Sequence, residues 1–178
     1  MSKEDEKLLN KGVAFDLDFT LINWNNIKNL IAGIEILQPV INQKHIRSEY
    51  RWTRQLPAQY LENLRYKLPQ KIRVAEKIKR AMQQLEDKKI CTALITDSTL
   101  DAEHSAMLEC FDHIVITSRY GCSKPLNDSF YSLVAQTGVP ISHWTYVGDN
   151  RYLDGNFALS CGATYLDIET IEELNKII

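Results

Sequence analysis

The sequence predicts an α/β fold: a three-layer, Rossmann-like parallel sheet with a small α-helical cap inserted after the first strand. Two observations carry this prediction. Along residues 69–178, short apolar runs alternate with segments of helical periodicity, and strands that alternate with helices build parallel sheets from βαβ units. Residues 27–68 instead show helical patterns throughout, a stretch too long for an ordinary connection. We therefore expect a core formed by residues 1–24 and 69–178 and a cap formed by residues 25–68.

Short runs rich in apolar and β-branched residues predict the strands. The first run begins at Val13 and ends abruptly in polar residues at Asp16, as a buried parallel strand does. Further strands are expected at Ile90–Thr96, His113–Thr117, Trp144–Val147 and Ala163–Ile168.

Apolar residues at helical spacing predict the helices. In the cap, helical stretches near residues 27–37, 42–56 and 58–68 are each followed by a proline, which stops a helix. A long amphipathic helix follows, and its apolar face consists of Ile72, Ala75, Ile78, Met82 and Leu85. Later helices are expected at Leu100–Glu109, Ser129–Gln136 and Leu153–Cys161, and from about Glu169 onward. We expect Gly138 and Gly162 to close two of them.

The composition limits the partners and the location. With 25% charged and 44% apolar residues, the chain resembles an ordinary soluble domain. A net charge of −2 gives no electrostatic basis for nucleic acid or an acidic membrane as the main partner. No apolar run approaches the ~20 residues that span a bilayer, and the charged segment Met1–Lys11 is not a signal peptide. The cysteines, which show no CxxC spacing, favour reduced thiols in small core positions and a cytoplasmic location; they are Cys91, Cys110, Cys122 and Cys161.

Polar side chains stand where the predicted strands end. In chain order they are Asp16, Asp18 and Thr20, then Thr96, Asp97 and Ser98, then Lys124, then Asp149 and Asp154. The carboxyl ends of parallel strands share one edge of a sheet, and open α/β sheets bind ligands there. We therefore expect these side chains to form one site.

The same residues resemble the motifs of the haloacid dehalogenase (HAD) superfamily. Its first motif, DxDxT after a hydrophobic strand, matches Asp16-Leu17-Asp18-Phe19-Thr20. The hydroxyl that ends its second strand matches Thr96, and its Lys-Pro pair matches Lys124-Pro125. Its fourth motif, a Gly-Asp pair with a further Asp, matches Gly148-Asp149 and Asp154. One departure is Phe19, where many members carry Gly. The matches run in the family's order over most of the chain.

The resemblance implies a Mg²⁺ cofactor and a set of oxygen ligands for it. Asp16, Asp149 and the main-chain carbonyl of Asp18 would supply the protein ligands, since Mg²⁺ prefers oxygen donors and keeps several waters. Asp154 would bind directly or through water. Alternatively, Asp154 is only an acid in the first turn of a helix, favoured there by the helix dipole.

The resemblance also assigns catalytic roles. Asp16 would be the nucleophile that forms an aspartyl-phosphate, and Asp18 the general acid and base. Thr96 would bond a phosphoryl oxygen, and Lys124 would neutralise charge in the transition state. We expect Thr20, Asp97 and Ser98 at the substrate too, the last two through backbone N–H groups. The plainer alternatives are that Asp16 and Asp18 only cap a turn and that Lys124 is a solvated surface charge.

The cap combines basic and aromatic residues. Between Gln43 and Arg73, arginines and lysines are interleaved with Tyr50, Trp52, Tyr60 and Tyr66. Such a lid could bind an anionic substrate, and we expect Arg51 or Arg54 to contact it. The alternative is an ordinary pair of helices with a solvated basic face.

Taken together, these residues predict a Mg²⁺-dependent phosphatase that hydrolyses a small-molecule phosphomonoester. The presence of Asp18 favours the phosphatases over the dehalogenases of the superfamily, which lack an acid at that position because halide leaves without protonation. A phosphomutase that returns the phosphoryl group to a sugar uses the same residues and is the second hypothesis. A non-catalytic binding module with the same fold is the third. The oligomeric state is left open by the sequence.

Overall fold

The protein folds around one parallel β-sheet, seen in a computed structural model that describes residues 11–17, 20–21, 76–96, 110–117, 124 and 127–178. The strands of the described residues are β1 (Gly12–Phe15), β2 (Cys91–Thr96), β3 (His113–Ile116), β4 (Trp144–Gly148) and β5 (Thr164–Asp167). Their order in the sheet is β3-β2-β1-β4-β5, and every neighbouring pair is parallel. The first strand in the chain is therefore the central strand of the sheet.

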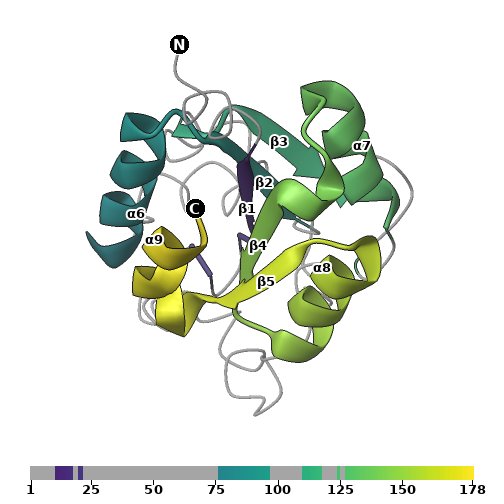
Figure 1. Ribbon diagram of the computed structural model, residues 1–178. Helices are drawn as coiled ribbons and strands as arrows, with labels where there is room; N and C mark the ends of the chain where they lie inside the picture. Colours follow the sequence, from purple (N-terminus) through teal and green to yellow (C-terminus); the bar gives the residue numbers. More distant parts are fainter. Residues whose placement is uncertain (1–10, 18–19, 22–75, 97–109, 118–123, 125–126) are drawn as a thin grey trace, which may run out of the picture.

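Helices cover both faces of this sheet (Figure 1). The helical segments are α6 (Glu76–Asp87), α7 (Asp128–Thr137), η6 (Ile141–His143), η7 (Arg151–Gly155), α8 (Asn156–Cys161), η8 (Ile168–Glu173) and α9 (Leu174–Ile177). In Figure 1, α6 and α9 lie together on one side, and α7 and α8 lie on the other. The handedness rule explains this division. From β1 to β3 the chain steps outward in one direction, and from β3 to β5 it steps back past β1 in the opposite direction, so the right-handed crossovers fall on opposite faces.

The reversal of strand order creates a switch point between β1 and β4, because the chain leaves these neighbouring strands toward opposite edges of the sheet. The backbone N–H of Asp16 continues this pairing one residue beyond β1, donating to the Val147 carbonyl at 2.8 Å. In open α/β sheets, ligand sites lie at such a point, outside the carboxyl ends of the strands.

A buried cluster lies between the sheet and the pair α7 and α8. Aromatic rings dominate it, and the rings of Phe130 and Phe157 both pack against Tyr146, at centroid distances of 6.1 and 5.2 Å. Trp144 also belongs to it and lies across Gly12, where a Cβ atom would come within 2.5 Å of the indole ring. The close approach of β4 to β1 therefore depends on a glycine at the start of the central strand.

Most of the strands and helices expected in the described residues are confirmed. All five strands occur within the expected ranges to one or two residues, and α7 spans the expected helix. Gly138 and Gly162 close α7 and α8 with φ values of 71° and 91°, in the left-handed region that glycine favours. Ile78 and Leu85 lie buried on one face of α6. No described helix has the length and apolar character needed to cross a membrane.

Three details of the expected pattern are wrong. The C-terminal helix is a 3₁₀ segment, η8, that kinks at Thr170 before the α-helix begins at Leu174. Asp167 explains the tight first turn, because its carboxylate accepts the Glu169 N–H at 2.9 Å. The helix expected at Leu153–Cys161 begins instead with the π-type turn η7. Cys110, expected in the core, is exposed. The cap, residues 25–68, and the helix expected at Leu100–Glu109 lie outside the described residues.

Candidate active site

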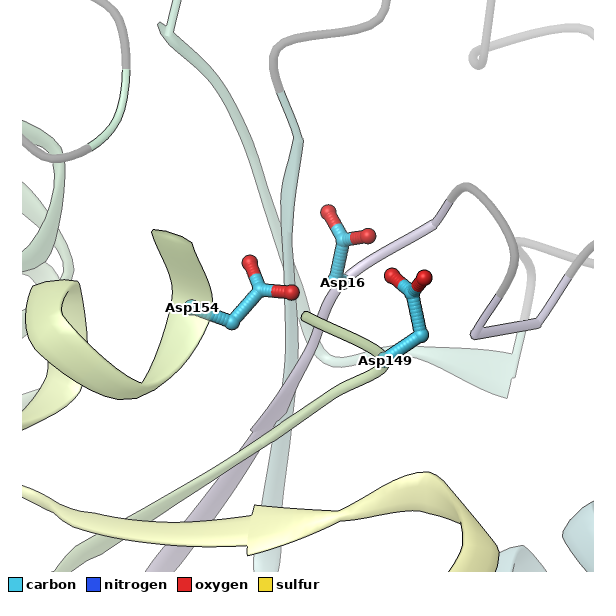
Figure 2. A group of neighbouring side chains, drawn as sticks. All are labelled: Asp16, Asp149 and Asp154. Carbon is cyan, nitrogen blue, oxygen red and sulfur yellow. The ribbon is translucent and has the colours of Figure 1, made fainter. Parts of the chain in front are cut away.

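Three carboxylates converge at the switch point of the sheet (Figure 2). Asp16 directly follows the central strand, Asp149 directly follows β4, and Asp154 lies in η7. One oxygen from each carboxylate lies within 4.8 Å of the other two. Asp16 and Asp154 are buried, whereas Asp149 is partly exposed. The structure thus brings together three of the four residues expected to bind a metal.

The π-type turn of η7 directs Asp154 back toward the sheet. The Asn150 carbonyl accepts the N–H groups of both Asp154 and Gly155, at 2.7 and 3.3 Å, which widens the turn. The Asn150 side chain caps the same turn by accepting from Tyr152 and Leu153. Asp154 in turn accepts the Asn150 N–H at 3.1 Å. Single π-turns often occur at functional sites, and here the turn places a buried carboxylate beside Asp16.

Lys124 lies among the carboxylates. Its ammonium donates to Asp16 Oδ1 at 2.5 Å, to Asp154 Oδ1 at 2.9 Å and to the Tyr146 hydroxyl at 3.0 Å. Only 8% of its side-chain surface is exposed, so the alternative of a solvated surface charge is wrong. A buried ammonium is costly unless it is paired, and Lys124 is paired twice.

Among the described residues of the site, the charges of the ionised groups do not balance without a cation. Three ionised carboxylates and one ammonium sum to −2, which one divalent ion would neutralise. The donors are all carboxylate oxygens, which suit a hard ion such as Mg²⁺. The residues present therefore fit the expected metal.

The proton affinities of the site reflect this excess of negative charge. Burial raises the pKa of Asp16 to about 7, opposed by Lys124 and reinforced by Asp154. Burial and the neighbouring Asp154 likewise raise the pKa of Asp149 to about 6. Burial alone would lower the pKa of Lys124, but the carboxylates of Asp16 and Asp154 hold this pKa well above its usual value. The ammonium is therefore permanent at neutral pH, while the carboxylates compete for protons.

Two tyrosines that the sequence patterns do not single out support the site. Tyr146 is fully buried in β4 and bonds Lys124. Tyr165 in β5 donates its hydroxyl to the Gly148 carbonyl at 3.1 Å, immediately before Asp149. Both read as ordinary strand residues in the sequence. The available signal is chemical: a tyrosine in a buried strand needs a partner for its hydroxyl.

The remaining expected site residues divide into two groups. Thr96 is buried at the carboxyl end of β2, beside the central strand. Thr20 is buried too, and its hydroxyl has no hydrogen-bond partner among the described residues. Asp18, Asp97, Ser98, Arg51 and Arg54 lie outside the described residues.

Comparison with known families agrees with this fold. A model described as haloacid dehalogenase-like hydrolase matches residues 32–166, well over half of the chain. The match includes Thr96, Lys124, Asp149 and Asp154 but begins after Asp16. The chain belongs to the haloacid dehalogenase-like hydrolases. Among curated proteins, none matches it.

Solved structures of this family share the fold at low sequence identity. A HAD phosphatase from Thermococcus onnurineus has a TM-score of 0.72 at 21% identity, over 94% of this chain and 97% of that one. A 2-haloacid dehalogenase from Pseudomonas syringae gives 0.65 at 15% identity, with the same coverage of 94% and 97%. A protein described as a putative beta-phosphoglucomutase from Thermotoga maritima gives 0.65 at 14%, over 94% and 99%. These likenesses establish the fold and leave the reaction open among hydrolases of this family.

Proposed function

We propose that this protein is a Mg²⁺-dependent phosphatase that hydrolyses a small phosphomonoester through a phosphorylated Asp16. The observation that carries the proposal is the position of Lys124, buried between Asp16 and Asp154 with Asp149 close by. A phosphoryl group that approaches Asp16 would meet fixed positive charge on one side and a site for a divalent ion on the other. Positioning and charge neutralisation of this kind provide most of the catalysis of phosphoryl transfer.

Asp16 is suited to act as the nucleophile. It is held by the sheet, since its N–H bonds Val147 in the neighbouring strand, and its carboxylate is nearly free of water. A desolvated carboxylate has lost the hydration that would weaken its attack. The ammonium of Lys124, 2.5 Å away, opposes the effect of burial on the pKa of Asp16 and so favours the ionised, nucleophilic form.

The reaction would proceed in two steps. In the first, an Asp16 oxygen forms a bond to phosphorus while the ester bond to the leaving oxygen breaks, and Asp18 gives that oxygen a proton. In the second, Asp18 takes a proton from water as the water oxygen attacks phosphorus, and the bond to Asp16 breaks to release phosphate. Lys124 and the hydroxyl of Thr96 would hold phosphoryl oxygens in both steps. The proton that Asp18 gives is thus regained in each turnover.

The residues that would hold Mg²⁺ are Asp16 and Asp149, with Asp154 bound directly or through water. The ion would supply charge neutralisation of the phosphoryl oxygens and of the carboxylates around them. Asp154 also has a role that does not depend on a metal, since it forms an ion pair with Lys124 at 2.9 Å.

Phosphate ester hydrolysis is favoured over halide displacement by the demand for a proton. An alkoxide leaving group requires an acid, whereas a halide does not, and the sequence provides Asp18 two residues after Asp16. A cluster of carboxylates suited to a divalent ion also fits phosphate chemistry, since phosphate brings negative charge that needs neutralising. The similarity to a HAD phosphatase agrees with this choice. Thr20, Asp97, Ser98, Arg51 and Arg54 remain predicted substrate contacts.

An assay with p-nitrophenyl phosphate tests the proposal. The wild-type protein is compared with Asp16→Asn in Mg²⁺ and in EDTA, and a panel of phosphorylated metabolites follows. Asp128→Asn is the matched control, because Asp128 is exposed in the first turn of α7. We expect Mg²⁺-dependent phosphate release in the wild type and the control, and none in Asp16→Asn.

Two results would contradict the proposal. Turnover by Asp16→Asn near the wild-type rate would exclude Asp16 as the nucleophile. Transfer of labelled phosphate to a sugar without net release would identify a mutase instead. If no phosphorylated compound reacts, fluoride release from fluoroacetate or chloride release from 2-chloropropionate would indicate a dehalogenase.

A further inference from the structure

The hydroxyl of Tyr146 joins the ammonium of Lys124 to the sheet. It accepts a hydrogen bond from Lys124 Nζ at 3.0 Å and donates one to the Ile95 carbonyl at 3.2 Å. The direction of both bonds is fixed by chemistry, because an ammonium has only donors and a carbonyl only acceptors. The hydroxyl thus has one defined orientation, and it is fully buried.

This contact spans three strands. Tyr146 belongs to β4, Ile95 belongs to β2, and the central strand β1 lies between them. Ala14 of β1 is the register partner of Tyr146 and faces the same buried cluster. A methyl side chain at this position leaves room for the phenol ring to cross the central strand and reach Ile95. The next residue, Thr96, is the expected phosphate ligand at the end of β2.

Packing fixes the ring as well. The ring centroids of Phe157 and Phe130 lie 5.2 and 6.1 Å from that of Tyr146, and the Lys124 ammonium lies 5.5 Å from the Tyr146 ring centroid. An apolar ring would satisfy these packing contacts equally well. The hydroxyl is therefore the part of Tyr146 that the core does not require.

The need for this hydroxyl arises during turnover. When Asp16 carries the phosphoryl group, it loses the full negative charge that holds Lys124 in the ligand-free protein. Asp154 and Tyr146 are partners of the ammonium that do not receive the phosphoryl group. Both contacts would then contribute to fixing the position of the ammonium.

We propose that Tyr146 is a positioning residue that holds the Lys124 ammonium on the transferred phosphoryl group. This inference rests on the proposed function, because Lys124 acts there on the phosphoryl oxygens. It predicts that the Tyr146 hydroxyl affects the transition state more than substrate binding.

The test compares Tyr146→Phe with wild type and with Tyr131→Phe, a matched control on the exposed side of α7. Steady-state kinetics with p-nitrophenyl phosphate are measured well below the Tm of each variant. Inhibition constants for vanadate, which resembles the pentacoordinate transition state, and for inorganic phosphate are measured alongside. We expect kcat of Tyr146→Phe to fall about tenfold, the effect of losing one hydrogen bond to a charged group. KM and phosphate inhibition should stay within about twofold, while vanadate inhibition weakens by about the same factor as kcat.

Other outcomes overturn the inference in distinguishable ways. A lower Tm with unchanged kcat and vanadate affinity would show that the hydroxyl only stabilises the fold. An increase in KM with unchanged kcat would assign Tyr146 to ground-state binding. If wild type and Tyr131→Phe release no phosphate from any ester and bind no vanadate, the proposed function fails, and this inference fails with it.

Discussion

Gly148 and Asp154 pack so closely that a Cβ atom on residue 148 would lie 2.5 Å from the Asp154 Cβ and from its Oδ2. Residue 148 therefore has no room for a side chain. The reason is the contact with Asp154 and not an unusual backbone conformation. The space that a methyl group would fill is taken by the carboxylate that pairs with Lys124. The glycine before Asp149 is thus part of what positions Asp154.

Replacing Gly148 by alanine should displace Asp154 from the site. We expect Gly148→Ala to lower the free energy of unfolding by about 1–3 kcal/mol, as overpacking of a filled site does, and to weaken Mg²⁺ binding. Urea unfolding and calorimetric titration with Mg²⁺ measure the two effects. Gly138→Ala is the control, because no atom of the residues that the structure describes lies within 4 Å of the missing Cβ of Gly138, whose φ is left-handed at 71°. The control should cost stability through backbone strain alone and leave Mg²⁺ affinity unchanged; equal loss of affinity in both variants would contradict the steric account.

The raised pKa of Asp16 predicts a pH-dependent stability in the absence of metal. Because this pKa rises from 3.8 to about 7 on folding, the folded protein holds a proton that the unfolded chain has released. The stabilising contribution is complete below about pH 4 and is lost as the pH rises through about 7. In EDTA, the wild type should lose on the order of a few kcal/mol relative to Asp16→Asn between pH 4 and pH 8.

Urea unfolding of wild type and Asp16→Asn across this pH range measures the difference between their free energies of unfolding. Taking this difference cancels the effects of the titratable groups that the two proteins share. Asp128→Asn again serves as the control, and its difference from wild type should stay flat with pH. A stability difference between wild type and Asp16→Asn that also stays flat would show that the Asp16 carboxylate is ionised throughout.

Magnesium should stabilise the protein, and more strongly at high pH. The ion binds the folded site and must displace protons from Asp16 and Asp149, whose pKa values are about 7 and 6. At a concentration about 100 times its Kd, Mg²⁺ should add about 2.7 kcal/mol to the free energy of unfolding at pH 8, and clearly less at pH 5.5. Thermal unfolding with Mg²⁺ and with EDTA at both pH values measures this. Asp149→Asn should abolish the increase while Asp128→Asn retains it; a rise in Tm that survives in Asp149→Asn would place the ion elsewhere.

The sequence predicted the sheet and the site's carboxylates because both follow from local patterns. A strand that ends in Asp16, or in Gly148-Asp149, carries its signal in a few consecutive residues. The role of Lys124 could be predicted only from the resemblance to a family, since the residues next to it in the sequence do not distinguish a buried lysine from an exposed one. Burial comes from the sheet: the switch point brings Asp16 and Asp154 to either side of the ammonium.

The contacts that were not predicted connect residues far apart in the chain. Tyr146 reads as one more apolar strand residue until β2 is seen two strands away, with the Ile95 carbonyl in reach. The π-type turn at Arg151–Gly155 overlaps the start of the helix that was expected at Leu153–Cys161, and its hydrogen bonds to the Asn150 carbonyl are not visible in a local pattern. The turn places the Asp154 carboxylate 2.9 Å from the Lys124 ammonium, a contact between residues 30 positions apart.

The placement of the first strand at the centre of the sheet also governs when the site can exist. The residues that meet around Lys124 come from positions 16, 146 and 154, so the site is built from contacts of high sequence separation, which form slowly and together. During synthesis, Asp16 emerges 131 residues before its backbone partner Val147. Catalytic competence would therefore require the whole domain: in a nascent chain that ends before β4, the central strand can pair only with β2, and Lys124 lacks the carboxylate of Asp154.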